Sequence, residues 1–527
     1  MDTFARDHLP PAALWPTIEF TTPELKYPER LNAATELIDV PVARFGRDRP
    51  ALRTPTGEVW TYGELLTRAD QVAQVLTEDL GLVAGQRVLL RSPNNPWTVA
   101  AWLGVLKAGG VLVTTMAALR TRELIPIVER TRPTIALVDN RFTDDVRTLP
   151  LTVVDYDDLA LRAGTKPGEF TAVDTAADDV ALLAPTSGST GSPKITMHFH
   201  RDILSIDNTF GRHVLRLNEN DLVACTAPFA FTFGLGMLVV FPLRAGACAL
   251  LTETATPAQL ADLVAQHGVT VLATAPTAYK AILRDGIEEK LSGLRTAVSA
   301  GEHIPLGTWE RLRDRLGLKV IDGIGATELL HIFISAAGDD IRPGATGKPV
   351  PGYRATVLDF DGTELGPGEP GRLGVIGPVG CRYLDDARQK DYVVGGWNVT
   401  GDIFHRDEDG YFYYHARSDH MIVSSGYNIG GPEVEEAIDT HPDVLESAVV
   451  AKPDEERGSV VCAFVVLRDG AAGDAAKARE IQDHVKRTIA PYKYPRDVRF
   501  RTSLPRNASG KLQRFALRKI VEDEVLP

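Results

Sequence analysis

Short runs of β-branched and aliphatic residues alternate with segments of helical apolar spacing from about residue 60 onward. Residues 88–90 predict a strand, residues 96–107 a helix and residues 109–113 the next strand. Strands that alternate with helices are typical of a parallel sheet, because a crossover connection must return each strand in the same direction. The pattern recurs over residues 221–322. We therefore expect an α/β fold with two doubly wound sheets.

The pattern changes between about residues 342 and 415, where turn signals such as Asp361-Gly, Pro367-Gly and Asp409-Gly separate short strands. This spacing leaves no room for long helices and predicts a small β-barrel-like subdomain. After it, expected helices and strands are mixed in a compact stretch, which indicates a small α+β domain that begins near residue 420. The expected helices cover residues 432–440, 475–489 and 515–522, and the expected strands cover residues 445–451 and 460–467.

The formal net charge of the 527-residue chain is −13, from 57 Lys and Arg against 70 Asp and Glu. Broad binding to nucleic acid or to an anionic membrane requires a basic surface, so we expect neither partner. The cysteines share no C-x-x-C spacing, which argues against a disulfide framework or a structural zinc site and favours a reducing cytoplasm. They are Cys225, Cys248, Cys381 and Cys462. The first residues carry charges where a signal peptide is apolar, and no apolar run is long enough for a membrane span.

The most informative segment is residues 185–194, Pro-Thr-Ser-Gly-Ser-Thr-Gly-Ser-Pro-Lys, which follow an apolar run. A loop this rich in Gly, Ser and Thr can turn backbone N–H groups toward anionic oxygens, and its hydroxyls and lysine add further donors. It is not a P-loop, because the spacing G-x-x-x-x-G-K-[ST] has no match in the chain. A loop of this composition alone is as often an ordinary surface loop, but the order of its residues predicts a phosphate site.

That order resembles the phosphate signature of the adenylate-forming superfamily, which includes acyl- and aryl-CoA synthetases, nonribosomal peptide adenylation domains and firefly luciferase. Further segments resemble the superfamily's other signatures in the right order, so the resemblance covers essentially the whole chain. They are residues 299–302, 322–328, 400–402, 417–426 and 505–511. The resemblance implies an N-terminal adenylation domain of residues 1–418 and a mobile C-terminal lid of residues 419–527, with its hinge at Asp419.

The resemblance also implies roles for individual residues, with ATP, Mg²⁺ and CoA as the small molecules that they serve. The catalytic group comprises Lys194, His200, Thr327, Glu328 and Lys511, and Glu328 is the expected Mg²⁺ ligand. The nucleotide contacts are Thr186, Ser187, Gly188, Ser189, Thr190, Gly191, Gly301, Glu302, Asp322, Gly323, Asp402 and Arg417. The acyl pocket comprises Thr232, Phe233, Ala300, Gly325 and His331, and the hinge and CoA tunnel comprise Asp419, Ser425 and Gly426. For His200, orienting the phosphate loop and merely capping a helix stand as equal alternatives.

The substrate class is inferred from residues 228–236 and 329–333, which resemble the benzoate and 2-aminobenzoate CoA ligases more than fatty acyl or acetyl enzymes. In these ligases an aromatic gate falls at Phe233 and a histidine near the carboxylate at His331. The alternative for Phe233 is ordinary core packing, and the alternative for His331 is a structural histidine with satisfied hydrogen bonds. Two departures from the commoner pattern are Ile195, where glycine is frequent, and Gly325, where many relatives have tyrosine. The second is shared with benzoate-type ligases.

We therefore expect an AMP-forming aryl-CoA ligase that activates a small aromatic acid, with 2-aminobenzoate first and benzoate next. Three alternatives stay open: an enzyme that loads the aryl group onto the phosphopantetheine of a carrier protein, an enzyme acting on another acid or an oxyanion, and a nucleotide-binding regulator without turnover. A homodimer is a further partner to consider. The resemblance also implies that a lysine acetyltransferase acts on Lys511, because acetylation would remove the charge that adenylation needs.

Overall fold

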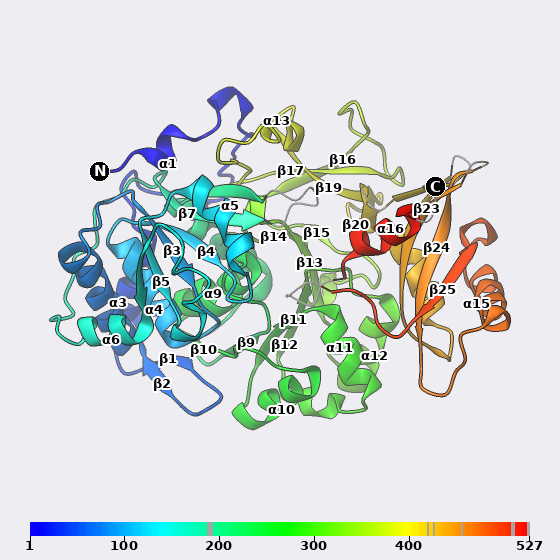
Figure 1. The fold of residues 1–527 in the computed structure, drawn as a ribbon, viewed down its shortest axis with the longest axis horizontal. Coiled ribbons are helices and arrows are strands. Elements are labelled where there is room, and N and C mark those ends of the chain that lie inside the picture. The colour runs from blue at the N-terminus through cyan, green and yellow to red at the C-terminus, as the bar shows by residue number, and fades with distance from the viewer. Residues whose placement is uncertain (187–192, 419–420, 425–426, 455–456, 507–511, 524–527) are drawn as a thin grey trace. The chain divides into compact units, whose positions relative to one another are not determined.

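Figure 1 shows the computed structural model of the chain, which describes residues 1–186, 193–418, 421–424, 427–454, 457–506 and 512–523. The chain divides into two compact units. The first comprises Met1–Ala355 and Gly374–Val399, and the second comprises Thr356–Leu373 and Thr400–Pro527. Among the described residues no helix is both long and apolar enough to cross a membrane.

The first α/β layer of unit one is a six-stranded sheet in the order β6-β5-β3-β4-β7-β8. Its neighbours pair in parallel except β7 and β8, which form an antiparallel hairpin. The strands are β3 Arg87–Arg91, β4 Val111–Thr115, β5 Ile135–Val138, β6 Thr152–Asp155, β7 Val180–Thr186 and β8 Lys194–Phe199. The associated helices are α3 Tyr62–Gln74, α4 Pro96–Lys107, α5 Thr121–Thr131 and α6 Tyr156–Ala163.

The second layer is a nine-stranded sheet in the order β15-β14-β13-β12-β11-β9-β10-β1-β2. Its central strands are parallel, and β2, β14 and β15 are antiparallel to their neighbours. The strands are β1 Pro50–Arg53, β2 Val59–Thr61, β9 Leu222–Cys225, β10 Cys248–Leu250, β11 Val271–Thr274, β12 Thr296–Ala300, β13 Ile321–Gly325, β14 Ile332–Ser335 and β15 Lys348–Pro349. The helices that follow its strands include α8 Thr232–Leu235, α9 Phe241–Ala245, α10 Pro257–His267, α11 Pro276–Arg284 and α12 Leu306–Leu316.

Local sequence explains where several of these helices begin and end. Helix α4 starts at Pro96, whose missing N–H costs nothing in the first turn, and the Asn95 side chain accepts the N–H of Thr98. Helix α10 has a capping box between Thr256 and Gln259, and it ends at Gly268 in the left-handed region. The expected strand–helix alternation and the two α/β sheets are confirmed.

The stretch expected to be β-rich contains a five-stranded sheet in the order β16-β17-β19-β18, with β20 paired to β19. Between residues 342 and 415, all of which are described, the one α-helix is the four-residue α13, Gln389–Tyr392. The strands are β16 Arg354–Leu358, β17 Gly371–Ile376, β18 Val393–Val394, β19 Trp397–Arg406 and β20 Phe412–Arg417.

The C-terminal part of unit two is an α+β fold built on the three-stranded sheet β23-β24-β25. Side chains alternate across this sheet, as the pleat requires. Val449, Val461 and Ala463 pack with α14 and α15, whereas Ala448 and Phe464 pack with α16. The elements are β21 Met421–Ser424, β22 Tyr427–Gly430, α14 Gly431–Asp439, β23 Val444–Asp454, β24 Gly458–Leu467, α15 Ala475–Thr488, β25 Asp497–Arg501 and α16 Arg514–Asp523.

The division of the chain differs from the expected boundary between residues 418 and 419. Unit two already includes the chain from Thr400, because β19 pairs with β20 from Asp402 to Arg406 and α14 packs on β20. Asp419 lies outside the described residues, so its role as the hinge stays a prediction.

Candidate active site

The expected phosphate loop is the turn of the β7–β8 hairpin. Thr186 and Lys194 are the last pair of the hairpin ladder, so the hairpin brings the two ends of the loop together. Both side chains are partly exposed at this end. Ser187, Gly188, Ser189, Thr190 and Gly191 lie outside the described residues.

A segment from much later in the chain runs beside β8. Tyr383 forms a bridge to Thr196, the N–H of Met197 donates to the carbonyl of Arg382 over 2.8 Å, and the N–H of Leu384 donates to the carbonyl of Ile195 over 2.9 Å. This pairing sets the Tyr383 ring beside the end of the hairpin that carries Lys194.

The segments at 299–302 and 322–328 leave the nine-stranded sheet at the same edge. Strands β12 and β13 are parallel, and Ala300 is in register with Gly323. Gly301 and Glu302 therefore follow one strand where Gly325 ends the next, which is the edge where α/β sheets bind ligands. Thr327 and Glu328 then lie in a single 3₁₀ turn, Thr327–Leu329.

Glu328 is held by a hydrogen-bonded chain. The Tyr383 hydroxyl donates a short hydrogen bond to Oε1 of Glu328, and Nζ of Lys194 lies 3.2 Å from the same hydroxyl. Tyr383 is fully buried, and burial together with the negative charge of Glu328 raises its pKa far above the usual value. The phenol therefore keeps its proton and serves as the donor. Two expected catalytic residues are thus joined through one that the sequence did not single out.

The same segment of the chain also carries the expected acyl-pocket histidine. The ring of His331 lies 5.6 Å from the ring of Phe233, 5.2 Å from Phe210 and 4.8 Å from Phe241, measured between centroids. Burial lowers the pKa of His331 to about 3, against a smaller opposite effect of the Phe233 backbone, so the ring is neutral. In the part of the chain that the structure describes, neither ring nitrogen has a hydrogen-bond partner of normal geometry.

Small residues make room for this aromatic box, which we define as Phe210, Phe233, Phe241 and His331. A Cβ on Gly236 would lie 2.5 Å from Nε2 of His331, and a Cβ on Gly325 would lie 2.7 Å from the carbonyl oxygen of His331. Thr232 is adjacent to Phe233 in α8. The structure therefore groups Phe233, Gly325 and His331, while Ala300 ends the strand beside β13.

Leu330 connects the turn that carries Glu328 to His331 of the aromatic box, and its backbone conformation is strained. Its φ is +67° and its ψ is −31°, and the N–H of His331 donates to the carbonyl of Leu329 over 2.9 Å. This is the hydrogen bond of a γ-turn, a conformation that a bulky residue rarely adopts. The turn sends Glu328 and His331 in different directions.

His200 has a structural partner. It is fully buried at the start of α7, His200–Ile206, and its Nδ1 accepts the N–H of Ala33 over 3.1 Å. Burial lowers its pKa to about 4. A role in orienting the phosphate loop stays a prediction.

His198 lies on β8, within the β7–β8 hairpin. Its Nε2 lies 3.0 Å from Oγ1 of Thr196. Burial lowers its pKa to about 3, the charge of Arg382 acting in the same direction and the Thr327 backbone in the opposite one. Sequence reasoning missed it, although it lies two residues from His200.

Asp322 and His303 line a small pocket at the edge of the nine-stranded sheet. Nδ1 of His303 lies 3.8 Å from Oδ2 of Asp322. Burial raises the pKa of Asp322 to about 8 and lowers that of His303 to about 4, so both side chains favour their neutral forms. Asp322 is in register with Ser299 on β12, which links the two nucleotide segments.

Asp402 and Arg417 lie together in unit two. They are in register on β19 and β20, and Nη1 of Arg417 lies 3.4 Å from Oδ1 of Asp402 and 3.3 Å from the carbonyl oxygen of Thr400. The other expected residues on this side of the chain, Asp419, Ser425, Gly426 and Lys511, lie outside the described residues.

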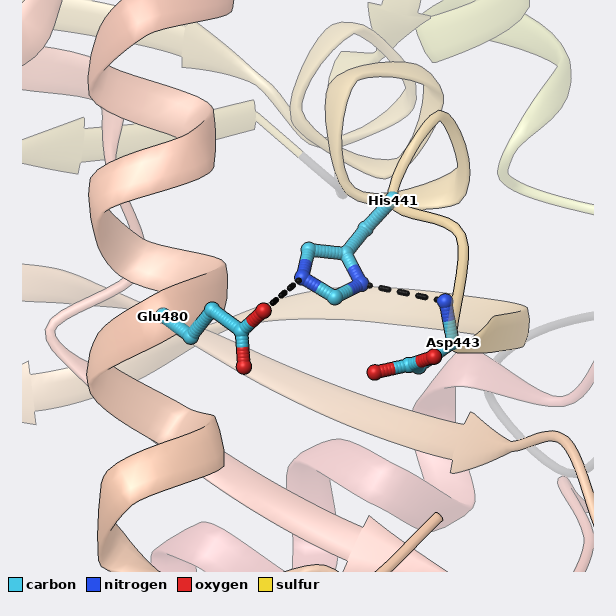
Figure 2. A group of neighbouring side chains, drawn as sticks. All are labelled: His441, Asp443 and Glu480. Carbon is cyan, nitrogen blue, oxygen red and sulfur yellow. Dashed lines mark hydrogen bonds and ion pairs between the residues drawn. The ribbon is translucent and has the colours of Figure 1, made fainter. Parts of the chain in front are cut away.

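His441, Asp443 and Glu480 form a separate group of metal-type ligands in unit two (Figure 2). Nδ1 of His441 accepts the N–H of Asp443, and its Nε2 lies 3.3 Å from Oε1 of Glu480. Nζ of Lys477 lies 2.5 Å from both Oδ2 of Asp443 and Oε2 of Glu480. The lysine already forms ion pairs with both carboxylates, so this group is an ion-pair cluster.

The half-buried carboxylate of Glu328 fits the expected Mg²⁺ ion. Mg²⁺ in phosphate-transfer sites is usually held by one or two carboxylates together with substrate phosphates. The bond from Tyr383 engages Oε1 of Glu328, so Oε2 would be the oxygen that holds the cation.

Comparisons with known proteins identify the family of this chain. Residues 39–382 match the AMP-binding enzyme family and residues 433–511 match the AMP-binding enzyme C-terminal domain. This chain belongs to the AMP-binding enzyme family. It is an enzyme of the acid–thiol ligase type, and its large α/β part with a smaller C-terminal part is the fold of adenylate-forming ligases.

Similar proteins extend over nearly the full length of this AMP-binding enzyme. The benzoate–CoA ligase of Thauera aromatica is 35% identical over 94% of this chain and 98% of its own. The human mitochondrial acyl-coenzyme A synthetase ACSM3 is 33% identical over 87% of this chain and 83% of its own. The crystal structure of the anthranilate CoA ligase AuaEII in complex with anthranoyl-AMP has a TM-score of 0.90 at 31% identity and covers 96% of this chain and 100% of the other.

Proposed function

We propose that this AMP-binding enzyme is an ATP-dependent aryl-CoA ligase for a small aromatic carboxylic acid, with 2-aminobenzoate first and benzoate next. The observation that carries the proposal is the aromatic box around His331, which lies three residues from the carboxylate of Glu328. Flat apolar walls suit a ring, and a neutral imidazole supplies one polar group. The benzoate and anthranilate ligases among the similar proteins support the same class.

The proposed reaction has two half-reactions and needs no protein nucleophile. A carboxylate oxygen of the acid attacks the α-phosphorus of ATP, the bond to the β-phosphate oxygen breaks, and pyrophosphate leaves. The CoA thiolate then attacks the acyl carbon, and the bond to AMP breaks. Catalysis therefore depends on positioning and on cationic stabilisation of the phosphates.

The expected site residues have separate roles in these half-reactions. Lys194 and the donors of the phosphate loop bind phosphate oxygens, and Glu328 and Thr327 hold the metal–phosphate group. Mg²⁺, when bound, neutralises charge on the phosphates. Asp402 accepts hydrogen bonds from the ribose hydroxyls, Arg417 binds ribose or phosphate, and Lys511 stabilises charge during adenylation. Rotation at Asp419 would then exchange Lys511 for the Gly426 face.

A pyrophosphate-release screen with and without CoA tests the proposal. We expect 2-aminobenzoate, benzoate and salicylate to turn over, whereas linear acids longer than about six carbons should be excluded if the acid site is short and flat. A preference for octanoate over every aryl acid contradicts the aryl assignment. Aryl-AMP that forms without transfer to CoA points to a carrier-protein acceptor, and bound ATP with no active acid points to another acid or an oxyanion.

Lys511→Ala separates the two half-reactions. Adenylation should fall by roughly 10²–10³-fold, because one charge-stabilising donor is lost. Transfer from preformed aryl-AMP to CoA should stay near the wild-type rate. An equal loss in both steps contradicts the assignment of Lys511 to adenylation.

A further inference from the structure

Tyr383 stands between the two charged groups of the candidate active site. Its hydroxyl contacts Oε1 of Glu328 on one side, and Nζ of Lys194 lies 3.2 Å away on the other. Nζ of Lys194 also lies 5.0 Å from the centroid of the Tyr383 ring. Lys194 begins β8 of the six-stranded sheet, and Glu328 lies in the turn between β13 and β14 of the nine-stranded sheet, so this phenol joins the two layers at the site.

The direction of these hydrogen bonds follows from the chemistry of the three groups. An ammonium has only donors, a carboxylate only acceptors, and a phenol one donor with two acceptor positions. Because the Glu328 carboxylate can only accept, the single proton of the phenol is committed to Oε1 of Glu328. Lys194 must then donate to the oxygen lone pair. The order is therefore ammonium to phenol to carboxylate.

Tyr383 is itself fixed by the structure around it. Its backbone N–H donates to Oε1 of Gln389 over 2.8 Å, and Nε2 of Gln389 donates to the carbonyls of Leu14 and Cys381 over 2.9 and 3.0 Å. The ring of Tyr392 packs edge-on at 5.8 Å between centroids. A phenol held in this way keeps its hydroxyl at one place without substrate, as a preorganised site requires.

We infer that Tyr383 is a positioning residue that sets the distance between Lys194 and Glu328 and turns Oε2 of Glu328 toward the metal–ATP complex. This inference rests on the proposed function, because it assigns Glu328 to the metal and Lys194 to the phosphates. Tyr383 acts through these two residues and need not touch the substrate. Outer groups that orient a metal-binding carboxylate typically change metal affinity or activity by about 10- to 100-fold when they are removed.

Tyr383→Phe tests the inference, because it keeps the ring and its contact with Tyr392 and removes only the hydroxyl. We expect adenylation to fall by about 10- to 100-fold and the Mg²⁺ concentration for half-maximal rate to rise about tenfold. Transfer from preformed aryl-AMP to CoA should stay unchanged. In calorimetric titrations with a non-hydrolysable ATP analogue, the variant should lose most of the affinity gained on adding Mg²⁺.

Tyr392→Phe is the matched control, since it removes a hydroxyl from the neighbouring ring and keeps that ring beside Lys194. It should retain the wild-type Mg²⁺ dependence. A double-mutant cycle distinguishes an effect that acts through Glu328 from a general loss of packing. In a Glu328→Gln background, Tyr383→Phe should have little further effect on Mg²⁺ dependence.

The inference is overturned if Tyr383→Phe keeps the wild-type Mg²⁺ dependence, if Tyr392→Phe loses it equally, or if both half-reactions fall together. Full additivity in the cycle overturns it as well. If wild-type protein adenylates no acid, the proposed function fails, and the titration with the ATP analogue still decides the role of Tyr383. The melting temperature of each variant checks that it folds.

Discussion

The turn from Thr327 to His331 separates two unlike surroundings. On the Glu328 side, directed hydrogen bonds from Lys194 through Tyr383 fix the position of a charge. On the His331 side, three aromatic rings enclose a neutral imidazole. Directed bonds suit the metal–phosphate group, which is the same for every acid, whereas an apolar enclosure discriminates by shape. Substitutions on the first side should therefore change the rate for all acids, and those on the second should change which acid is used.

The largest expected effect comes from a substitution on the Glu328 side of the turn. Glu328→Gln should lower adenylation by roughly 10²–10³-fold, because a charge aimed at the metal–phosphate group is lost. The loss should be the same for benzoate, salicylate and hexanoate in a pyrophosphate-release assay. Glu129→Gln, a change of an exposed residue on α5, should leave the rate unaltered. A loss restricted to one acid would contradict the division between the two sides.

A smaller effect tests the polar group within the apolar side. His331→Ala should raise the barrier by about 1–3 kcal/mol for aryl acids if the imidazole contacts the carboxylate. The measurement is kcat/KM for 2-aminobenzoate, benzoate and hexanoate, with the KM for ATP as the internal control. A changed KM for ATP with unchanged acid preference would place His331 on the nucleotide side.

The shape of the aromatic box can be changed without removing any of its members. Gly236→Ala adds a methyl group 2.5 Å from Nε2 of His331, so the ring must shift. We expect about a tenfold loss of kcat/KM for ring acids, the size of one misplaced methyl in an apolar pocket. Gly307→Ala is the matched control, because its added Cβ would meet nothing within 4 Å. Equal losses in both variants would contradict the role of Gly236.

The smallest effect concerns a property that both sides share, which is a buried neutral histidine. Burial lowers the pKa of His198 and of His331 to about 3, below the unfolded value of 6.5. Because the unfolded chain binds more protons below pH 6.5, the stability from each neutral ring is complete above that pH. It falls by up to about 1.4 kcal/mol per pH unit as the pH drops toward the folded pKa.

Urea unfolding between pH 7.5 and 5 measures this slope. His331→Phe should flatten it by the contribution of one histidine, since the variant has no group there to protonate. A slope identical to that of the wild-type protein would show that His331 does not titrate differently in the folded and unfolded states.

Much of the fold followed from the sequence, because local signals marked the elements. Asn95 and Pro96 mark the start of α4, and its expected range of residues 96–107 is confirmed. That Thr327 and Glu328 lie together could also be expected, since they belong to one contiguous signature, and a single 3₁₀ turn holds them. The aromatic partners of Phe233 and His331 were missed. Phe210 lies in a π-helical segment, Asp207–Leu215, whose periodicity differs from that of an α-helix.

Tyr383 could not have been placed from the sequence in the same way. It lies 189 residues after Lys194 and 55 after Glu328, in a stretch whose pattern indicates only short strands. What brings the three together is the pairing of Tyr383 with Thr196, and strand register between distant segments depends on tertiary packing. A tyrosine in a β-rich stretch has packing as its ordinary role, so its residue type gives no sign of the contact.

The strained turn at Leu330 bears on attempts to change the acid that the enzyme uses. Only this residue separates His331 from the 3₁₀ turn that holds Glu328, and the relaxed conformation with the same hydrogen bond, the inverse γ-turn, would send the chain in a different direction. A redesign that moves His331 to admit a larger ring will therefore also move Glu328, the proposed Mg²⁺ ligand. Substrate range and turnover are therefore mechanically coupled at this turn. Phe210 and Phe241 lie on other segments, so enlarging the box at these residues should change the substrate range with less loss of turnover.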